Sequence, residues 1–150
     1  MKPPTRPRPA RWPGERRDRG ASGIQFAALA APLLLLLLVG VGVYRAAQAN
    51  LAVGAAAYDA ARAASISRTA GQAQSTARQA AAASLTQLGL ACTNPQVTLD
   101  LTGFTQPVGQ PATVTATVTC TADTSELGIG PGRTYTATAM SSLDTYRERS

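Results

Sequence analysis

The sequence contains no histidine among its 150 residues, and it contains only two cysteines. Without histidine the chain lacks the commonest general base and the commonest metal ligand. Two cysteines cannot complete a four-ligand zinc site, and no cluster of acidic residues compensates for them. We therefore expect no catalytic residue, no metal or other cofactor and no small-molecule substrate. The composition predicts a protein that is not an enzyme.

Aromatic residues are also scarce, with one Trp, four Tyr and two Phe. Ala and Thr supply much of the bulk, so few side chains are large enough to fill a thick core. A chain of this length forms at most one modest domain with appendages.

Positive charge is concentrated at the N-terminus. Residues 1–20 carry seven basic and two acidic side chains, a net charge of +5, whereas residues 46–150 carry six of each sign. Prolines in the segment forbid a helix, and it has too few apolar groups to fold, so we expect a disordered basic leader over 1–20. Such a run can also be a nucleic-acid-binding arm. The segment that follows favours a membrane signal instead, and we expect no nucleic acid partner.

A long uncharged segment follows the leader. Residues 24–44 carry no formal charge and include six consecutive leucines at 33–38. As a helix this segment spans about 32 Å, enough to cross a hydrocarbon core of roughly 30 Å. Pro32 is tolerable, because membrane helices can satisfy the carbonyl that it leaves unpaired. The pattern predicts a transmembrane helix over 21–45 in contact with membrane lipid; a buried core helix is the alternative, but the chain is too small to cover one.

Charge around this segment predicts its orientation. The excess of basic residues lies before the span, and only Arg45 lies close after it. Basic flanks stay on the cytoplasmic side. We expect a single-pass protein of the cytoplasmic (inner) membrane, with its N-terminus in the cytoplasm and its C-terminus outside.

Two kinds of proteolytic processing are compatible with this start. Ala47-Gln48-Ala49 resembles a signal-peptidase site, which would release a chain that begins at Asn50. However, the apolar region is longer than a signal peptide normally has. The other possibility is a cut at the end of the hydrophilic leader, between Gly20 and Ala21, which leaves the apolar helix attached.

The segment that follows the span is rich in alanine. Residues 46–92 contain 19 Ala, the residue with the highest helix propensity. We expect the membrane helix to continue beyond the bilayer into an Ala-rich extracytoplasmic helical region over 46–91. This region is interrupted at 69–71, and a second helix over 72–89 ends at Gly89. A low-complexity spacer helix is the alternative interpretation.

Period-two alternation replaces the helical pattern near the C-terminus. Apolar residues alternate with Thr or Asp over 97–102, 113–120 and 134–139, which predicts half-buried strands. Segments 107–111 and 128–132 are rich in Gly and Pro and supply the turns. We expect a small α+β body in which three antiparallel strands, within a β region over 92–150, pack on an Ala-rich helix.

The two cysteines fall in this exported part of the chain. Outside the cytoplasm an even pair of cysteines predicts a disulfide, here between Cys92 and Cys120. Two free buried thiols are the alternative.

Several features in a fixed order resemble the TadE/TadG-like family, the pseudopilin-like components of tight-adherence (Flp-type) pilus systems. They cover roughly residues 16–147 and are Arg19-Gly20, the small pair Ala21-Ser22, the segment 24–27, Pro32 with the leucine run, the Ala-rich segment 58–64, and the ending 144–147. The resemblance implies a pilin-like α+β fold and prepilin-type processing at Gly20 and Ala21. It also implies a prepilin peptidase and other pilus-assembly subunits as partners.

One residue departs from the family pattern. Members usually carry Glu five residues after the glycine, where the carboxylate pairs with the free amine of a neighbouring subunit; this chain has Gln25. A buried carboxylate in the membrane is costly unless it is paired, whereas an amide offers only a hydrogen bond. Gln25 is thus the candidate residue for subunit association, and a tolerated amide at the membrane boundary is the alternative.

Two functions remain open. The resemblance implies a TadE-like pseudopilin or minor component of a pilus assembly system that acts by protein–protein association. The alternative is a membrane-anchored or secreted small binding module unrelated to pili.

Overall fold

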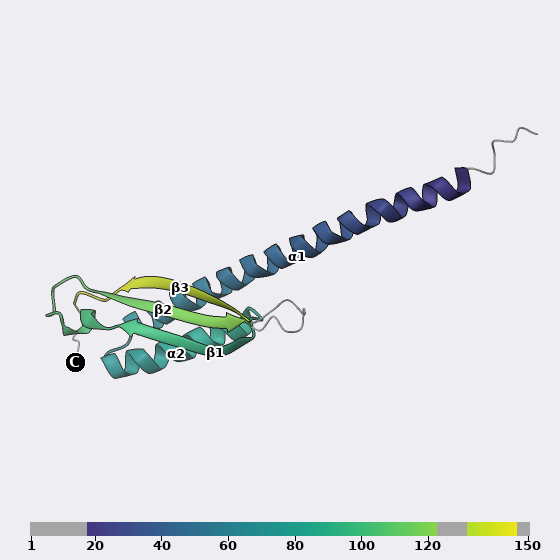
Figure 1. Ribbon diagram of the computed structural model, residues 1–150. Coiled ribbons are helices and arrows are strands. Elements are labelled where there is room, and N and C mark those ends of the chain that lie inside the picture. The colour runs from purple at the N-terminus through teal and green to yellow at the C-terminus, as the bar shows by residue number, and fades with distance from the viewer. Residues whose placement is uncertain (1–17, 123–131, 147–150) are drawn as a thin grey trace, which may run out of the picture. The chain divides into compact units, whose positions relative to one another are not determined.

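The computed structural model describes residues 18–122 and 132–146, with side chains from Phe26 onward apart from Ala27 (Figure 1). Residues 1–17 of the predicted leader, and most of the predicted turn 128–132, lie outside the described residues. The chain divides into two units, Met1–Val43 and Tyr44–Ser150.

The first helix, α1, spans Asp18–Ser65, 48 residues that include Pro32. It begins three residues before the expected start at 21, and it continues past 45 into the Ala-rich region, as predicted. The continuation has a simple cause: the segment after the span is rich in Ala and contains no proline, so the backbone has no reason to leave the helix. The predicted transmembrane helix and the first part of the predicted Ala-rich region are therefore one element.

The second helix, α2, spans Ala70–Gln87 and has a clear cap at each end. At its start the Thr69 hydroxyl accepts a hydrogen bond of 3.2 Å from the Gln72 amide, an N-cap interaction. At its end Gly89 adopts a φ of +68°, and the Leu90 amide donates to the Leu85 carbonyl at 3.0 Å. This is a Schellman motif. The helix thus lies two residues earlier than the predicted 72–89, because Thr69 caps it and does not interrupt it.

Three strands form one antiparallel sheet of order β1-β2-β3, with β1 at Cys92–Asp100, β2 at Thr113–Ala122 and β3 at Arg133–Ser142. A short 3-10 helix, η1 (Thr102–Thr105), lies between β1 and β2. The predicted α+β class and antiparallel sheet are confirmed. β1 begins earlier than the alternation indicated, because Asn94 (φ +63°) and Pro95 interrupt the pattern at an irregularity between Thr93 and Gln96.

The two faces of the sheet differ in chemistry. On the inner face, the side chains of Val114, Ala116, Val118 and Cys120 in β2 are fully buried. On the outer face, threonines of β2 and β3 form hydrogen-bonded cross-strand pairs: Thr117 with Thr138 at 3.0 Å, Thr119 with Thr136 at 3.2 Å, and Thr121 with Thr134 at 3.1 Å. Such pairs stabilise antiparallel sheets, so the same alternation that buries Val and Ala also builds the outer surface.

The core of the second unit is made mainly of small side chains from both helices and from β2. Its members from α1 are Val53, Ala56, Ala57, Ala60, Ala61 and Ala64; those from α2 are Ala73, Ala77, Ala81 and Leu85. Phe104 of η1 and Leu143 after β3 also belong to the cluster. Because most of its members are alanine, the core contains few large side chains, as the scarcity of aromatic residues predicted.

Candidate membrane span and assembly surface

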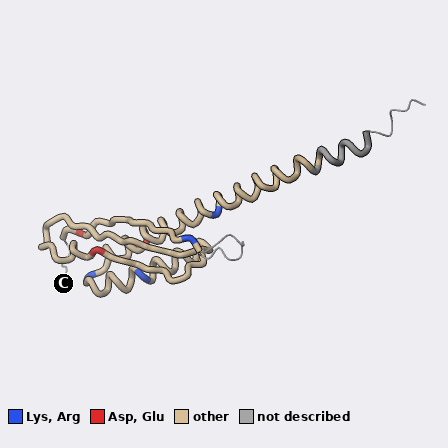
Figure 2. The backbone as a smooth tube through the Cα atoms, in the orientation of Figure 1, with Lys and Arg blue, Asp and Glu red and all other residues tan. Residues whose placement is uncertain are grey.

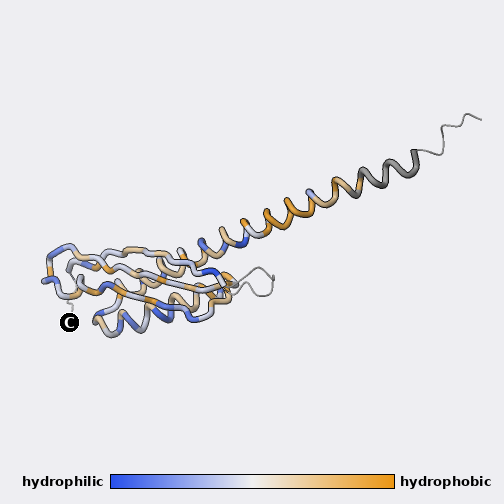
Figure 3. The backbone as a smooth tube through the Cα atoms, viewed as in Figure 1, coloured by the Kyte–Doolittle hydropathy of each residue, from blue (hydrophilic) through white to orange (hydrophobic). Residues whose placement is uncertain are grey.

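The leucine run of α1 is exposed on every side of the helix. The side chains of Leu33–Leu38 are each between 59% and 68% exposed, and every described side chain from Ala28 to Tyr44 is exposed. Figure 3 shows this stretch as the continuous hydrophobic part of α1. A helix that is apolar around its whole circumference needs either a large protein core or a membrane around it.

Within residues 18–122 and 132–146, α1 is the one helix long and apolar enough to cross a membrane, and it lies near the N-terminus. Figure 2 shows few charged residues in the described part of the chain, and the stretch from Phe26 to Tyr44 has none. The predicted span is thus confirmed as a candidate membrane helix. Its orientation, and the membrane to which it belongs, stay predictions.

The predicted processing junction lies in the first turns of α1. Gly20, Ala21 and Gln25 all have helical backbone, whereas their side chains lie outside the described residues. The helix starts at Asp18, so the bond between Gly20 and Ala21 follows the helix start by one turn or less. The roles predicted for these three residues stay predictions.

The competing signal-peptidase triplet lies in the middle of the same helix. Ala47, Gln48 and Ala49 are helical, and Ala49 is buried, with 5% of its surface exposed. The Gln48 side-chain amide donates a hydrogen bond of 2.9 Å to the Tyr44 hydroxyl. A cut after Ala49 would divide this helix next to the buried residues Ala52 and Val53. The triplet therefore belongs to a helix whose next turn is part of the core of the second unit.

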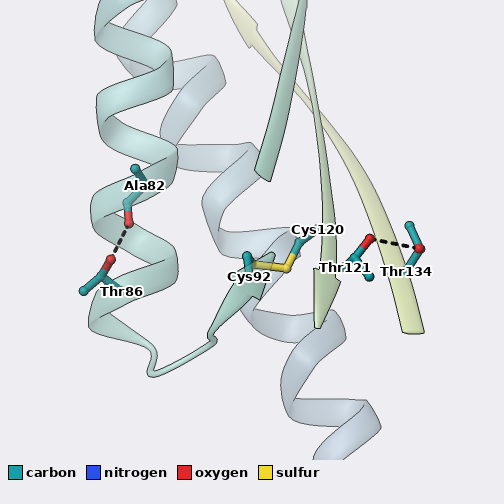
Figure 4. Close-up of a disulfide and its surroundings, with 6 residues drawn as sticks. All are labelled: Ala82, Thr86, Cys92, Cys120, Thr121 and Thr134. Carbon is teal, nitrogen blue, oxygen red and sulfur yellow. Dashed lines mark hydrogen bonds between the residues drawn. A yellow bond between two sulfur atoms is a disulfide. The ribbon is translucent and has the colours of Figure 1, made fainter. Parts of the chain in front are cut away.

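The predicted disulfide between Cys92 and Cys120 is confirmed (Figure 4). It joins the first residue of β1 to the inner face of β2, and the two Cα atoms are 5.4 Å apart, a usual separation for a disulfide. Cys120 is fully buried. The bond lies at the end of the β1–β2 pairing where Cys92 is opposite Ala122. No described cysteine is free.

The carboxyl group of Asp100 stabilises the start of η1. Asp100 Oδ1 accepts hydrogen bonds from the Thr102 amide at 3.0 Å and from the Thr102 hydroxyl at 2.8 Å. These two bonds lower the pKa of the Asp100 carboxyl from its ordinary value of 3.8, because both favour the charged form. Among the described residues no three His, Cys, Asp or Glu side chains group together as metal ligands would.

Comparison with protein-family models, with curated proteins and with solved structures finds no match for this chain. The resemblance to the TadE/TadG-like family and the non-enzymatic function therefore stay predictions.

Sequence reasoning missed one surface of α1. Where α1 packs in the second unit, its buried face is built almost wholly of alanine, whereas the large side chains Tyr44, Leu51 and Tyr58 are 63%, 68% and 56% exposed. Their spacing of seven residues was the available signal. We name this face the outer stripe; it comprises Tyr44, Gln48, Leu51, Ala55, Tyr58 and Arg62.

Proposed function

We propose that this chain is a TadE-like pseudopilin or minor component of a tight-adherence (Flp-type) pilus assembly system, held by a single membrane pass and acting through protein–protein association. The observation that carries the proposal is the order of its parts. A hydrophilic basic leader ends at Gly20, an exposed apolar helix follows, and that same helix continues without a break into a disulfide-bonded α+β unit.

The continuity of α1 supports processing at the leader in preference to release by signal peptidase. A cut between Gly20 and Ala21 removes the basic leader and keeps the membrane helix, and the only described helical residues lost are Asp18, Arg19 and Gly20. A cut after Ala49 would instead take away the part of α1 that precedes the buried Ala52 and Val53. The first cut leaves the folded unit intact and anchored.

N-terminal sequencing of the chain recovered from membranes tests the proposal. We expect a chain that begins at Ala21, and we expect Gly20→Leu to block the cut without preventing insertion. Gly40→Leu is the matched control, because a side chain at Gly40 meets open space in the same helix and lies far from the junction. A membrane-bound chain that begins at Met1 would favour the binding module unrelated to pili, and a soluble chain that begins at Asn50 would do the same.

The orientation is tested separately. A reporter that is active only outside the cytoplasm, fused after Ser150, should be active, because the leader carries a net charge of +5 and only Arg45 lies close after the span. The same fusion with a reporter that is active only in the cytoplasm should be silent. The reverse pattern would overturn the orientation and, with it, the disulfide-permissive compartment on which the proposal relies.

The neutral Gln25 gives the proposal a second test. In a pilin-like assembly the residue at this position faces the amine of a neighbouring processed subunit, and a carboxylate would form a charge-assisted bond worth about 1.5–3 kcal/mol. Gln25→Glu should therefore increase co-purification with pilus-assembly subunits, and Gln74→Glu, at an exposed position of α2, should not. An equal effect of both substitutions would point to charge alone and not to a docking residue.

A further inference from the structure

The part of α1 between Tyr44 and Ser65 has two apolar faces. One face packs on the rest of the second unit and consists of Val53 and a series of alanines with almost no exposed surface. The other face is the outer stripe, and it carries the large residues Tyr44, Leu51 and Tyr58. A surface helix normally keeps its large apolar residues on the buried face and polar residues outside, so this distribution is inverted.

Spacing aligns the members of the outer stripe. Tyr44, Leu51 and Tyr58 are seven residues apart. Gln48 and Ala55 fall between them and Arg62 follows Tyr58, so that the spacing alternates between four and three residues. This alternation is the a/d pattern of a helix that packs against another helix. Residues seven apart drift by only about 20° around a straight helix, so the three large side chains form one line along α1.

The chemistry of the outer stripe allows it to pair with itself. Its only formal charge is that of Arg62 at one end, and Asp59 in the same turn compensates it. Ala55 is small and lies between the large residues Leu51 and Tyr58. A large side chain of a second helix can therefore pack against Ala55. Gln48 is the one uncharged polar residue among the packing positions, the kind of position that can fix register.

We propose that the outer stripe is the interface of a parallel homodimer, in which α1 of a second copy of this chain packs against α1. The second copy is the occupant because the candidate membrane span is the same helix that carries the stripe. Two copies anchored in one membrane enter it with the same orientation, and anchoring raises their effective concentration. The interface is isologous, as a two-fold dimer requires.

This inference rests on membrane insertion of α1 and not on cleavage of the leader or on a role in pili. It assigns a function to Leu51 and Tyr58, whose exposed fractions of 68% and 56% are otherwise unexplained. The Ala-rich face stays packed within each subunit, so dimerisation requires no rearrangement of the core.

Cysteine cross-linking of the full chain in membranes of expressing cells tests the homodimer. Leu51→Cys and Tyr58→Cys should each give, on mild oxidation, a disulfide-linked species of twice the monomer mass that mass spectrometry identifies as two copies of this chain. Asn50→Cys is the matched control, because Asn50 is exposed and adjacent to Leu51 but lies outside the stripe. Its cross-linked fraction should be lower.

A second variant separates loss of pairing from loss of folding. Leu51→Lys should weaken dimerisation about tenfold or more, while the Cys92–Cys120 disulfide still resists alkylation and the melting temperature of the second unit stays unchanged. Four results would each overturn the proposal. They are cross-linking at Asn50 equal to that at Leu51, absence of any cross-link, cross-linking of Leu51→Cys to a different protein, and unchanged dimerisation of Leu51→Lys. Failure of leader cleavage would overturn the proposed function and leave these results unaffected.

Discussion

The Ser141 hydroxyl of β3 donates a hydrogen bond of 2.9 Å to the Ser65 hydroxyl at the last residue of α1. Ser65 in turn donates to the Arg62 carbonyl at 2.9 Å, and only 8% of its surface is exposed. The two serines are 76 positions apart in the chain. This relay joins the C-terminal end of α1 to the last strand of the sheet.

Ser65→Ala should destabilise the second unit by about 0.5–1.5 kcal/mol, because it removes two hydrogen bonds and leaves the Ser141 hydroxyl without this acceptor. Chemical denaturation followed by circular dichroism measures the change. Ser75→Ala is the control, since Ser75 is exposed and bonds only the nearby Gln72 carbonyl among the hydrogen bonds described here; its effect should be close to zero. Equal effects of both substitutions would contradict a special role for the relay.

Removal of the disulfide should be the most destabilising single change. Cys92 and Cys120 are 28 positions apart, and closing a loop of this size contributes about 3–4 kcal/mol in the chain-entropy model. Reduction of the wild-type bond should lower the free energy of unfolding by this amount, because it leaves the packing volume of both sulfurs in place. Intact mass after alkylation, with and without reductant, verifies the state of the thiols. An unchanged denaturation midpoint after complete reduction would refute this estimate.

Gly103→Ala should destabilise the fold by about 1–3 kcal/mol. A Cβ atom at Gly103 would overlap the Thr113 carbonyl oxygen and lie 2.9 Å from Leu143 Cδ1, whereas a Cβ at Gly54 meets nothing within 4 Å. Gly54→Ala is therefore the matched control and should be neutral or stabilising, by up to about 1 kcal/mol, since Ala is the better helix former. The melting temperature should fall for Gly103→Ala, and it should stay the same or rise for Gly54→Ala.

The lowered pKa of Asp100 predicts a weak acid sensitivity with a definite sign. Because the folded pKa lies below the unfolded one, the contribution to stability is present above the ordinary value of 3.8 and is lost as the pH falls through the folded pKa. An NMR titration should find the pKa below 3.8 in the wild type. Thr102→Val removes the hydroxyl donor and keeps the amide donor, so the pKa should move part of the way back up; no change would assign the shift to the amide alone.

Much of the fold could be predicted from the sequence because two periodicities dominate it. The alternation of Thr with Val and Ala fixed the strands of β2 and β3, and the Ala content indicated the helices. The start of β1 could not be predicted, since Asn94 and Pro95 break its alternation and only pairing with β2 extends it back to Cys92. The break between α1 and α2 was displaced because Thr69 has both a turn-forming and a capping role.

The candidate site was less predictable. The apolar span and the cysteine pair follow from composition and compartment, and both are present in the structure. The seven-residue spacing of the outer stripe is visible in the sequence, but its exposure is not, because large apolar residues such as Leu51 and Tyr58 in an Ala-rich helix are normally assigned to the core. Their exposure became visible only when the structure placed alanine, and not these large side chains, against the sheet and α2.

The irregular start of β1 has a consequence for the behaviour of the protein at high concentration. Asn94 and Pro95 interrupt the row of backbone N–H donors along β1, which is one edge strand of the sheet. The other edge strand, β3, is ten residues long and pairs only with β2 among the described strands. Exposed regular edges are the places where sheets of different molecules join. If the second units of two molecules join edge to edge, β3 is the more regular of the two edges, because regular pairing of β1 with β2 begins only at Gln96. Asn94 and Pro95 thus shorten the regular part of the β1 edge at which another strand could add.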